Sequence, residues 1–137
     1  MRGIMTAGLT AMILLGGTAR PWADEPVVYR EVGKASFYGY EFAGQRTASG
    51  VRYDPRALTA AHPTLPLGTE VTVVALDTGK QVTVRINDRG PFVRGRKIDL
   101  SLRAAQALGI VDDGVARVRI TATEDQLARG KGRTAKG

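Results

Sequence analysis

Seventeen of the 137 residues are glycine, and they separate short runs of apolar residues along the whole chain. An average protein has about 7% glycine, so tight turns are unusually frequent here. Closely spaced turns favour short strands over a helical bundle. The clearest case is a pair of β-branched runs, Glu70–Leu76 and Lys80–Ile86, which are joined through Asp77-Thr78-Gly79. This pattern predicts a β-hairpin.

The segments between the other glycine-rich turns predict further short strands and one helix. Alternating or β-branched residues predict further strands at 34–40, 57–62, 97–100 and 115–122. Helix formers predict one helix over Ser101–Leu108, with Asp99 or Ser101 as its cap and Gly109 as its stop. Six or seven short strands with one helix are the pattern of a small closed β-barrel.

The N-terminus has the three parts of a secretory signal. Arg2 supplies a positive charge, Ile4–Leu15 is an apolar run too short to span a bilayer, and Gly17-Thr18-Ala19 offers small residues for cleavage. We therefore predict a signal peptide over residues 1–19, with Ala23 as the alternative end. A periplasmic or secreted protein without a stable membrane anchor is expected.

The rest of the chain divides into three parts. Residues 20–32 are interpreted as a lead-in with room for one short strand, residues 33–123 as one barrel domain and residues 124–137 as a basic, flexible tail. A chain of this length holds a single domain, and we expect it to be monomeric.

Composition excludes several kinds of site. The chain has no cysteine and a single histidine, which rules out disulfides, a thiol nucleophile, a lipid anchor on cysteine and any site of several histidines. No metal site and no cofactor are predicted. The net charge of +7 favours an anionic partner. Export makes a polymer of the cell envelope the expected partner rather than nucleic acid.

Four residues in the turn-rich centre are candidates for acid–base chemistry: Asp54, His62, Asp88 and Asp99. Cleavage of a glycosidic bond needs a proton donor for the leaving oxygen. Each candidate also has a structural interpretation. Asp54 and Asp88 stand in turn sequences, Asp99 can cap the following helix, and His62 lies in a stretch of small apolar residues. Residue types and spacing alone leave both interpretations open.

The same region resembles the rare lipoprotein A (RlpA) family in five motifs, which occur in the family's order. They are Gly33-Lys34-Ala35-Ser36-Phe37-Tyr38-Gly39, Thr47–Gly50 with Tyr53-Asp54, Leu58–His62 with Thr64–Thr69, Arg85–Phe92, and Gly95-Arg96 with Ile98–Ser101. The resemblance runs from about Gly33 to Gly109. It implies a mainly β fold, a small six-stranded double-psi β-barrel shared with expansins, with one or two short helices.

The resemblance also implies an activity. Members of the family are lytic transglycosylases, which cut peptidoglycan glycan strands that lack stem peptides. They close the muramic C6 hydroxyl onto C1 and so leave 1,6-anhydromuramic ends. The alternative is a non-catalytic, expansin-like module that binds cell-wall polysaccharide.

Residue roles follow from the matched motifs. Asp54 and His62 fall on positions that resemble functional positions of the family, and Asp99 resembles an aspartate of expansin-like barrels. Asp88 lies in the most distinctive motif, where it can tie Arg89 to the turn. The family has glutamate where this chain has Val51. The residues expected to contact substrate are Phe37, Tyr38, Val51, Tyr53 and Arg89.

Overall fold

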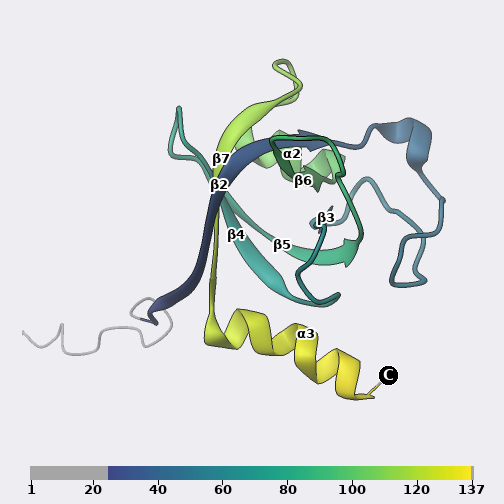
Figure 1. Ribbon diagram of the computed structural model, residues 1–137. Coiled ribbons are helices and arrows are strands. Elements are labelled where there is room, and N and C mark those ends of the chain that lie inside the picture. Colours follow the sequence, from purple (N-terminus) through teal and green to yellow (C-terminus); the bar gives the residue numbers. More distant parts are fainter. Residues whose placement is uncertain (1–24, 137) are drawn as a thin grey trace, which may run out of the picture.

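Six strands close into a barrel in the computed structural model, which describes residues 25–136, with side chains for residues 25–130. Going round the barrel, the order is β2-β6-β3-β5-β4-β7, and β7 returns to β2 (Figure 1). The strands are β2 (Val27–Phe37), β3 (Thr59–Ala61), β4 (Glu70–Ala75), β5 (Gln81–Asp88), β6 (Arg96–Leu100) and β7 (Ala116–Thr123). The helices are η2 (Tyr40–Phe42), α2 (Leu102–Leu108) and α3 (Glu124–Lys136). The predicted mainly β barrel is confirmed.

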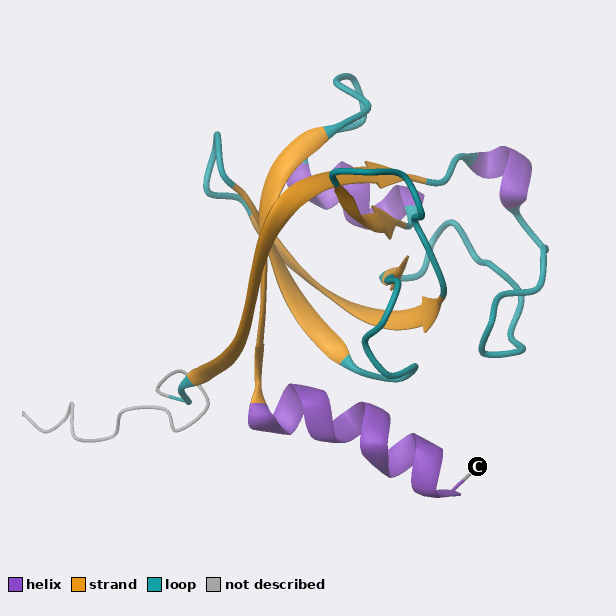
Figure 2. Cartoon of the chain, viewed as in Figure 1, coloured by secondary structure: helices purple, strands orange, loops and turns teal. Residues whose placement is uncertain are grey.

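The pairing of strands leaves a long connection outside the barrel. β2 pairs with β6 and β3 with β5 in parallel, whereas the other neighbours are antiparallel. The chain leaves β2 at Phe37 and does not re-enter the barrel until Thr59. The intervening residues project to one side as η2 and an extended loop (Figure 2). This segment is therefore available to form one wall of a site.

Alternation along the strands builds the core. In β4 every second residue is buried, and the same alternation places Val84 and Ile86 of β5 and Val118 and Ile120 of β7 inside the barrel. Ile98 and Leu100 of β6 complete the interior. Burying such side chains contributes about 25 cal/mol per Å² of apolar surface. Aliphatic packing is thus the main stabilising term in a chain without disulfides.

Helix α2 has the ends that the sequence predicts. Ser101 is its N-cap, accepting a hydrogen bond from the Ala104 amide, and Gly109 ends it in the left-handed conformation at φ 74°. Only glycine adopts this conformation without a steric cost. Leu102 and Leu108 anchor the helix to the core.

Strand β2 begins earlier than predicted. Residues 27–32 were expected to be a lead-in, but they pair antiparallel with β7, from Val27 opposite Thr123 to Val32 opposite Arg119. The partner strand is about 90 residues away, so a local pattern does not reveal the pairing. The barrel therefore starts at Val27.

The prediction of a flexible tail is wrong, because residues 124–136 form helix α3. Thr123 and Gln126 exchange hydrogen bonds between side chain and backbone amide, which is a capping box. Leu127 then packs against the core and Arg129 pairs with Glu70. The glycines of α3 have low intrinsic helix propensity, and these tertiary contacts stabilise the helix.

The predicted signal peptide, whether residues 1–19 or 1–23, lies outside the described residues. Within residues 25–136, none of the helices has the length and apolar character needed to cross a membrane.

The cap of α2 gives a test of the fold. Ser101 is fully buried and its hydroxyl also donates to the Ala57 carbonyl at 2.6 Å. Ser101→Ala removes the cap and leaves that carbonyl without its partner, so the free energy of unfolding should fall by about 1–3 kcal/mol. Urea denaturation measures it. Gln106→Ala, at an exposed position of the same helix, should change stability by less than about 0.5 kcal/mol. Equal effects of the two substitutions would contradict the assigned role of the cap.

Candidate active site

An open cleft of about 580 Å³ lies where the long loop meets the barrel. The loop contributes Val51 and Asp54, strand β5 contributes Arg85 and Asn87, and the remaining lining residues are Ser49, Arg52, Ala57, Thr59, Leu67, Gly68 and Ile86. The Ser49 amide donates to the Asn87 carbonyl at 3.1 Å, which ties the loop to β5. The cleft thus has one wall of loop and one wall of strand.

Asp54 is the one carboxylate among the residues that line this cleft. Its side chain is exposed, and Oδ1 accepts a hydrogen bond from the Arg56 amide at 2.9 Å. Within the described residues, no group donates to its other oxygen, Oδ2. One oxygen therefore fixes the orientation of the carboxylate and the other is available to a ligand.

Asp88 holds the loop in place. Its Oδ1 accepts hydrogen bonds from the amides of Ala48 and Arg89, both at 2.9 Å, and its Oδ2 accepts one from the Tyr38 hydroxyl at 3.1 Å. Burial and the charge of Asp88 raise the pKa of Tyr38 well above its usual value, so the phenol stays protonated and donates. Asp88 lines a second, smaller pocket of about 200 Å³ together with Tyr38 and Tyr53.

Asp99 is almost completely buried on β6. Its Oδ1 accepts hydrogen bonds from the Ser36 hydroxyl and from Arg96 Nη2, the latter at 2.9 Å. Ala61 of β3 stands opposite both Asp99 and Asp88, so the two carboxylates flank β3 in one row across the sheet. Asp99 lines neither of the two pockets. Its contacts join β2 to β6.

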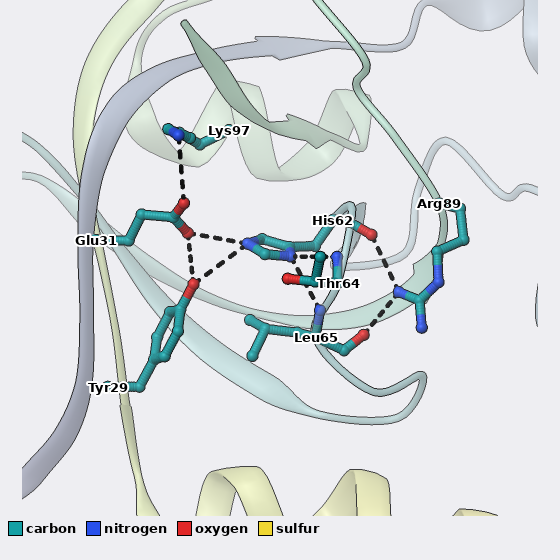
Figure 3. Close-up of polar contacts among 7 residues, drawn as sticks. All are labelled: Tyr29, Glu31, His62, Thr64, Leu65, Arg89 and Lys97. Carbon is teal, nitrogen blue, oxygen red and sulfur yellow. Dashed lines mark hydrogen bonds and ion pairs between the residues drawn. The ribbon is translucent and has the colours of Figure 1, made fainter.

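His62 is buried directly after β3, with 2% of its side chain exposed. The amides of Thr64 and Leu65 both donate to Nδ1 at 3.1 Å (Figure 3). A nitrogen that accepts carries no proton, so the ring is protonated on Nε2. Nε2 lies 2.9 Å from Glu31 Oε1 and donates to it. Both ring nitrogens are therefore occupied by protein groups.

The Glu31 carboxylate, on β2, accepts hydrogen bonds from Tyr29 and His62 and lies near one cation, Lys97. The Tyr29 hydroxyl donates to Oε1 at 2.6 Å, and Lys97 Nζ lies 3.8 Å from Oε2 (Figure 3). Burial acts to raise the pKa of Glu31, but the hydrogen bonds from Tyr29 and His62 and the charge of Lys97 outweigh it and lower the pKa. The sequence analysis missed Glu31 and Tyr29. In a strand, residues two apart point to the same face. Assigning residues 27–33 to a strand would therefore have placed Tyr29, Glu31 and Gly33 on one face of the sheet.

Arg89 supports the turn after His62. Its Nη1 donates to the carbonyls of His62 at 3.0 Å and Leu65 at 2.6 Å. It thereby gives hydrogen-bond partners to two backbone carbonyls that lie beyond the end of the three-residue strand β3.

The aromatic candidates divide between core and pocket. Phe37 packs against the core, and Tyr53 is 5% exposed, with a hydroxyl that accepts from the Leu102 amide at 3.0 Å. Tyr38 packs edge-on against Tyr53, with ring centroids 5.1 Å apart. The structure thus places Asp54 and Val51 in the cleft and Tyr38, Tyr53 and Asp88 beside the smaller pocket. His62, Arg89 and Asp99 lie in supporting networks.

A family model described as "Lytic transglycolase" matches residues 30–120, well over half of the chain. The chain therefore belongs to the lytic transglycolase family, and its barrel is of the double-psi type.

The predicted resemblance to RlpA is confirmed by curated relatives. The endolytic peptidoglycan transglycosylase RlpA of Pseudomonas aeruginosa strain UCBPP-PA14 is 53% identical over 107 residues, which cover 78% of this chain and 31% of that protein. The probable endolytic peptidoglycan transglycosylase RlpA of Nostoc sp. is 59% identical over 90 residues, covering 64% of this chain and 24% of that protein.

The chain thus spans about a third or less of the length of these two relatives. Solved structures agree on the fold. The Streptomyces papain inhibitor has a TM-score of 0.56 and 24% identity, covering 72% of this chain and 99% of that one. A mutant expansin of Clavibacter michiganensis in complex with cellohexaose has a TM-score of 0.53 and 19% identity, covering 70% of this chain and 52% of that one.

The Glu31 network gives a test by pH. The lowered pKa means that the folded state binds this proton less readily than the unfolded state, so the stabilisation is present at neutral pH and is lost as pH falls below about 4.5. Glu31→Gln should therefore show a smaller loss of unfolding free energy between neutral and acid pH than the wild type. Urea denaturation over this range measures it. Glu41→Gln, at an exposed position of η2, controls for the loss of one negative charge. Parallel curves for wild type and Glu31→Gln would show that the network does not depend on the ionised carboxylate.

Proposed function

We propose that this chain is a lytic transglycosylase that cleaves peptidoglycan glycan strands, preferring strands without stem peptides. The observation that carries the proposal is the exposed, oriented carboxylate of Asp54 in an open cleft of a lytic transglycolase barrel. The names of the RlpA relatives support the reaction class.

One carboxyl group can serve both halves of the reaction. Protonated Asp54 donates to the glycosidic oxygen as the bond to C1 breaks, and its carboxylate then takes the proton of the muramic C6 hydroxyl as that oxygen closes onto C1. The products are a free hydroxyl on the leaving sugar and a 1,6-anhydromuramic end, with no water consumed. Position 51, where the family has glutamate, supplies no second carboxylate because it is valine. Asp54 therefore acts alone in the lining of the cleft.

The surrounding residues have supporting roles in this proposal. Asp88 fixes the loop that carries Asp54 through the Ala48 amide. His62, Glu31 and Arg89 hold the turn that leads to Leu67, which lines the cleft. Asp99 acts at a distance by joining β2 to β6. These residues are positioning residues.

The setting follows from the substrate. Peptidoglycan lies outside the cytoplasm, which agrees with the predicted signal peptide and with a basic chain that meets an envelope polymer. We propose a periplasmic or secreted monomer.

One observation favours a second function. Val51 is 54% exposed in the cleft at the position of the family's glutamate, and an apolar side chain there suits contact with a sugar face rather than proton transfer. The alternative is therefore a non-catalytic module that binds cell-wall polysaccharide, as an expansin-like barrel.

Substitution of Asp54 separates the two functions. Asp54→Asn should lower the yield of anhydromuramic ends from denuded glycan strands by about 10²–10⁴-fold, the usual contribution of a positioned acid–base group. Mass analysis of the digests measures the ends. Asp77→Asn, in the hairpin turn between β4 and β5, should retain wild-type activity. Val51→Glu should change the yield little if Asp54 carries the chemistry.

Three results would contradict the proposal. A folded wild type that yields no anhydro ends, under conditions where a full-length RlpA does, supports the binding module. A large gain with Val51→Glu, together with a weakly active wild type, assigns the chemistry to position 51. Ordinary reducing ends instead of anhydro ends would indicate a hydrolase.

A further inference from the structure

Glu70 is shared between two arginines, of which Arg85 lines the cleft. Its Oε2 lies 3.2 Å from Arg85 Nη2 and its Oε1 lies 2.6 Å from Arg129 Nη1. One carboxylate between two guanidinium groups leaves one positive charge uncompensated. The shorter contact is to Arg129, so the charge left over is that of Arg85.

Arg85 presents this charge to the cleft. It lies on β5 and lines the cleft, with 36% of its side chain exposed. Among the described residues, the Gly68 carbonyl at 3.3 Å is the one hydrogen-bond partner of its Nη1. Arg52 also lines the cleft, from the loop side, with its Nη1 on the Gly44 carbonyl at 2.9 Å. Two arginines and one aspartate, Asp54, are thus the charged groups of the lining.

Helix α3 makes the sharing possible. Leu127 packs on the core, and Gly130 sits so close to the 66–69 turn that a Cβ there would lie 3.0 Å from the Thr69 nitrogen and 3.1 Å from Pro66 Cβ. The same turn lines the cleft with Leu67 and Gly68. The close approach brings Arg129 to Glu70. The helix lies beyond residues 30–120 that match the family model.

We propose that Arg85 is a carboxylate-binding residue of the cleft, and that it recognises the lactyl carboxylate of N-acetylmuramic acid. The choice of this ligand rests on the proposed function. A guanidinium group matches a carboxylate with two parallel hydrogen bonds. In a strand without stem peptides the lactyl group ends in a free carboxylate, whereas an attached peptide converts it into a neutral amide. An ion pair between Arg85 and this carboxylate would make the cleft bind strands without stem peptides more tightly. Arg129 pairs with Glu70 and so leaves Arg85 available to the ligand.

Two disaccharides test the proposal without any cleavage. N-acetylglucosaminyl-N-acetylmuramic acid and N,N′-diacetylchitobiose, here called chitobiose, differ only in the lactyl ether, and neither contains the muramic-to-glucosamine bond that the proposed reaction cuts. Titration of the full chain, followed by nuclear magnetic resonance, should show that the muramyl disaccharide binds at least about tenfold more tightly, the effect expected of one charged hydrogen-bonded pair. The same disaccharide with its carboxylate converted to a methylamide should lose this advantage.

Variants assign the effect to the residue. Arg85→Gln should abolish the preference while chitobiose binding stays as in the wild type, and Arg85→Lys should keep part of it because the charge remains. Arg129→Gln should reduce the preference, because Glu70 then pairs with Arg85 alone. Arg117→Gln, at an exposed position of β7, is the matched control for loss of one positive charge and should keep the preference.

The proposal is overturned if wild type binds the two disaccharides equally, if it does not bind the muramyl disaccharide, or if folded Arg85→Gln keeps the preference. These outcomes are independent of the proposed function, which stands or fails on anhydromuramic ends from glycan strands. A chain that makes such ends but lacks the preference keeps its function and loses this assignment of Arg85. A chain that shows the preference but makes no such ends loses the proposed activity instead.

Discussion

The buried imidazole of His62 joins three parts of the chain that have little else to hold them together. Strand β3 has only three residues, yet it must close the barrel between β5 and β6. His62 follows it directly, accepts two backbone hydrogen bonds from the next turn on Nδ1 and donates to Glu31 of β2 through Nε2. Unpaired polar groups at this depth would cost about 1–3 kcal/mol each. The satisfied ring therefore fixes the start of the turn that contributes Leu67 and Gly68 to the cleft.

The loop wall of the cleft depends on Asp88 in the same way. Its carboxylate binds the Ala48 amide of the long loop, and the backbone of the same loop bonds to Asn87. Ala61 stands opposite both Asp88 and Asp99, so the short strand β3 sets the positions of both carboxylates. Asp88 and Asp99 thus hold neighbouring segments together. Asp54, at the exposed end of the loop, has an oxygen left for chemistry.

Sequence patterns predicted the elements whose stabilising contacts are between residues close together in the chain. The β4–β5 hairpin and the two caps of α2 follow from β-branched runs, from Ser101 and from Gly109, because their partners are near in sequence. The first half of β2 was missed because its pairing with β7 spans most of the chain. Helix α3 was missed because its glycines and basic residues are poor evidence for a helix, and contacts with Glu70 and the core hold it in place.

The candidate site shows the same division. The motifs singled out Asp54, Asp88, Asp99 and His62, because all four occur in recognisable segments, and favoured Asp54 or Asp99 as the acid–base group with the other two in support. Burial separates them, since burial depends on contacts such as that between Ser36 and Asp99, 63 residues apart. Glu31 was absent from the predicted site for a related reason: its significance comes from His62, 31 residues further along the chain.

The protonation of His62 tests the central claim most directly. The chain has one histidine, so a long-range proton–nitrogen correlation spectrum of the labelled protein reports this ring alone. The structure requires a proton on Nε2 and a bare, hydrogen-bond-accepting Nδ1 at neutral pH. Glu31→Ala, which removes the acceptor of the Nε2 proton, should perturb the Nε2 signal while Glu41→Ala leaves it unchanged. A wild-type ring protonated on Nδ1, or one that exchanges between the two tautomers as a free imidazole does, would contradict the account.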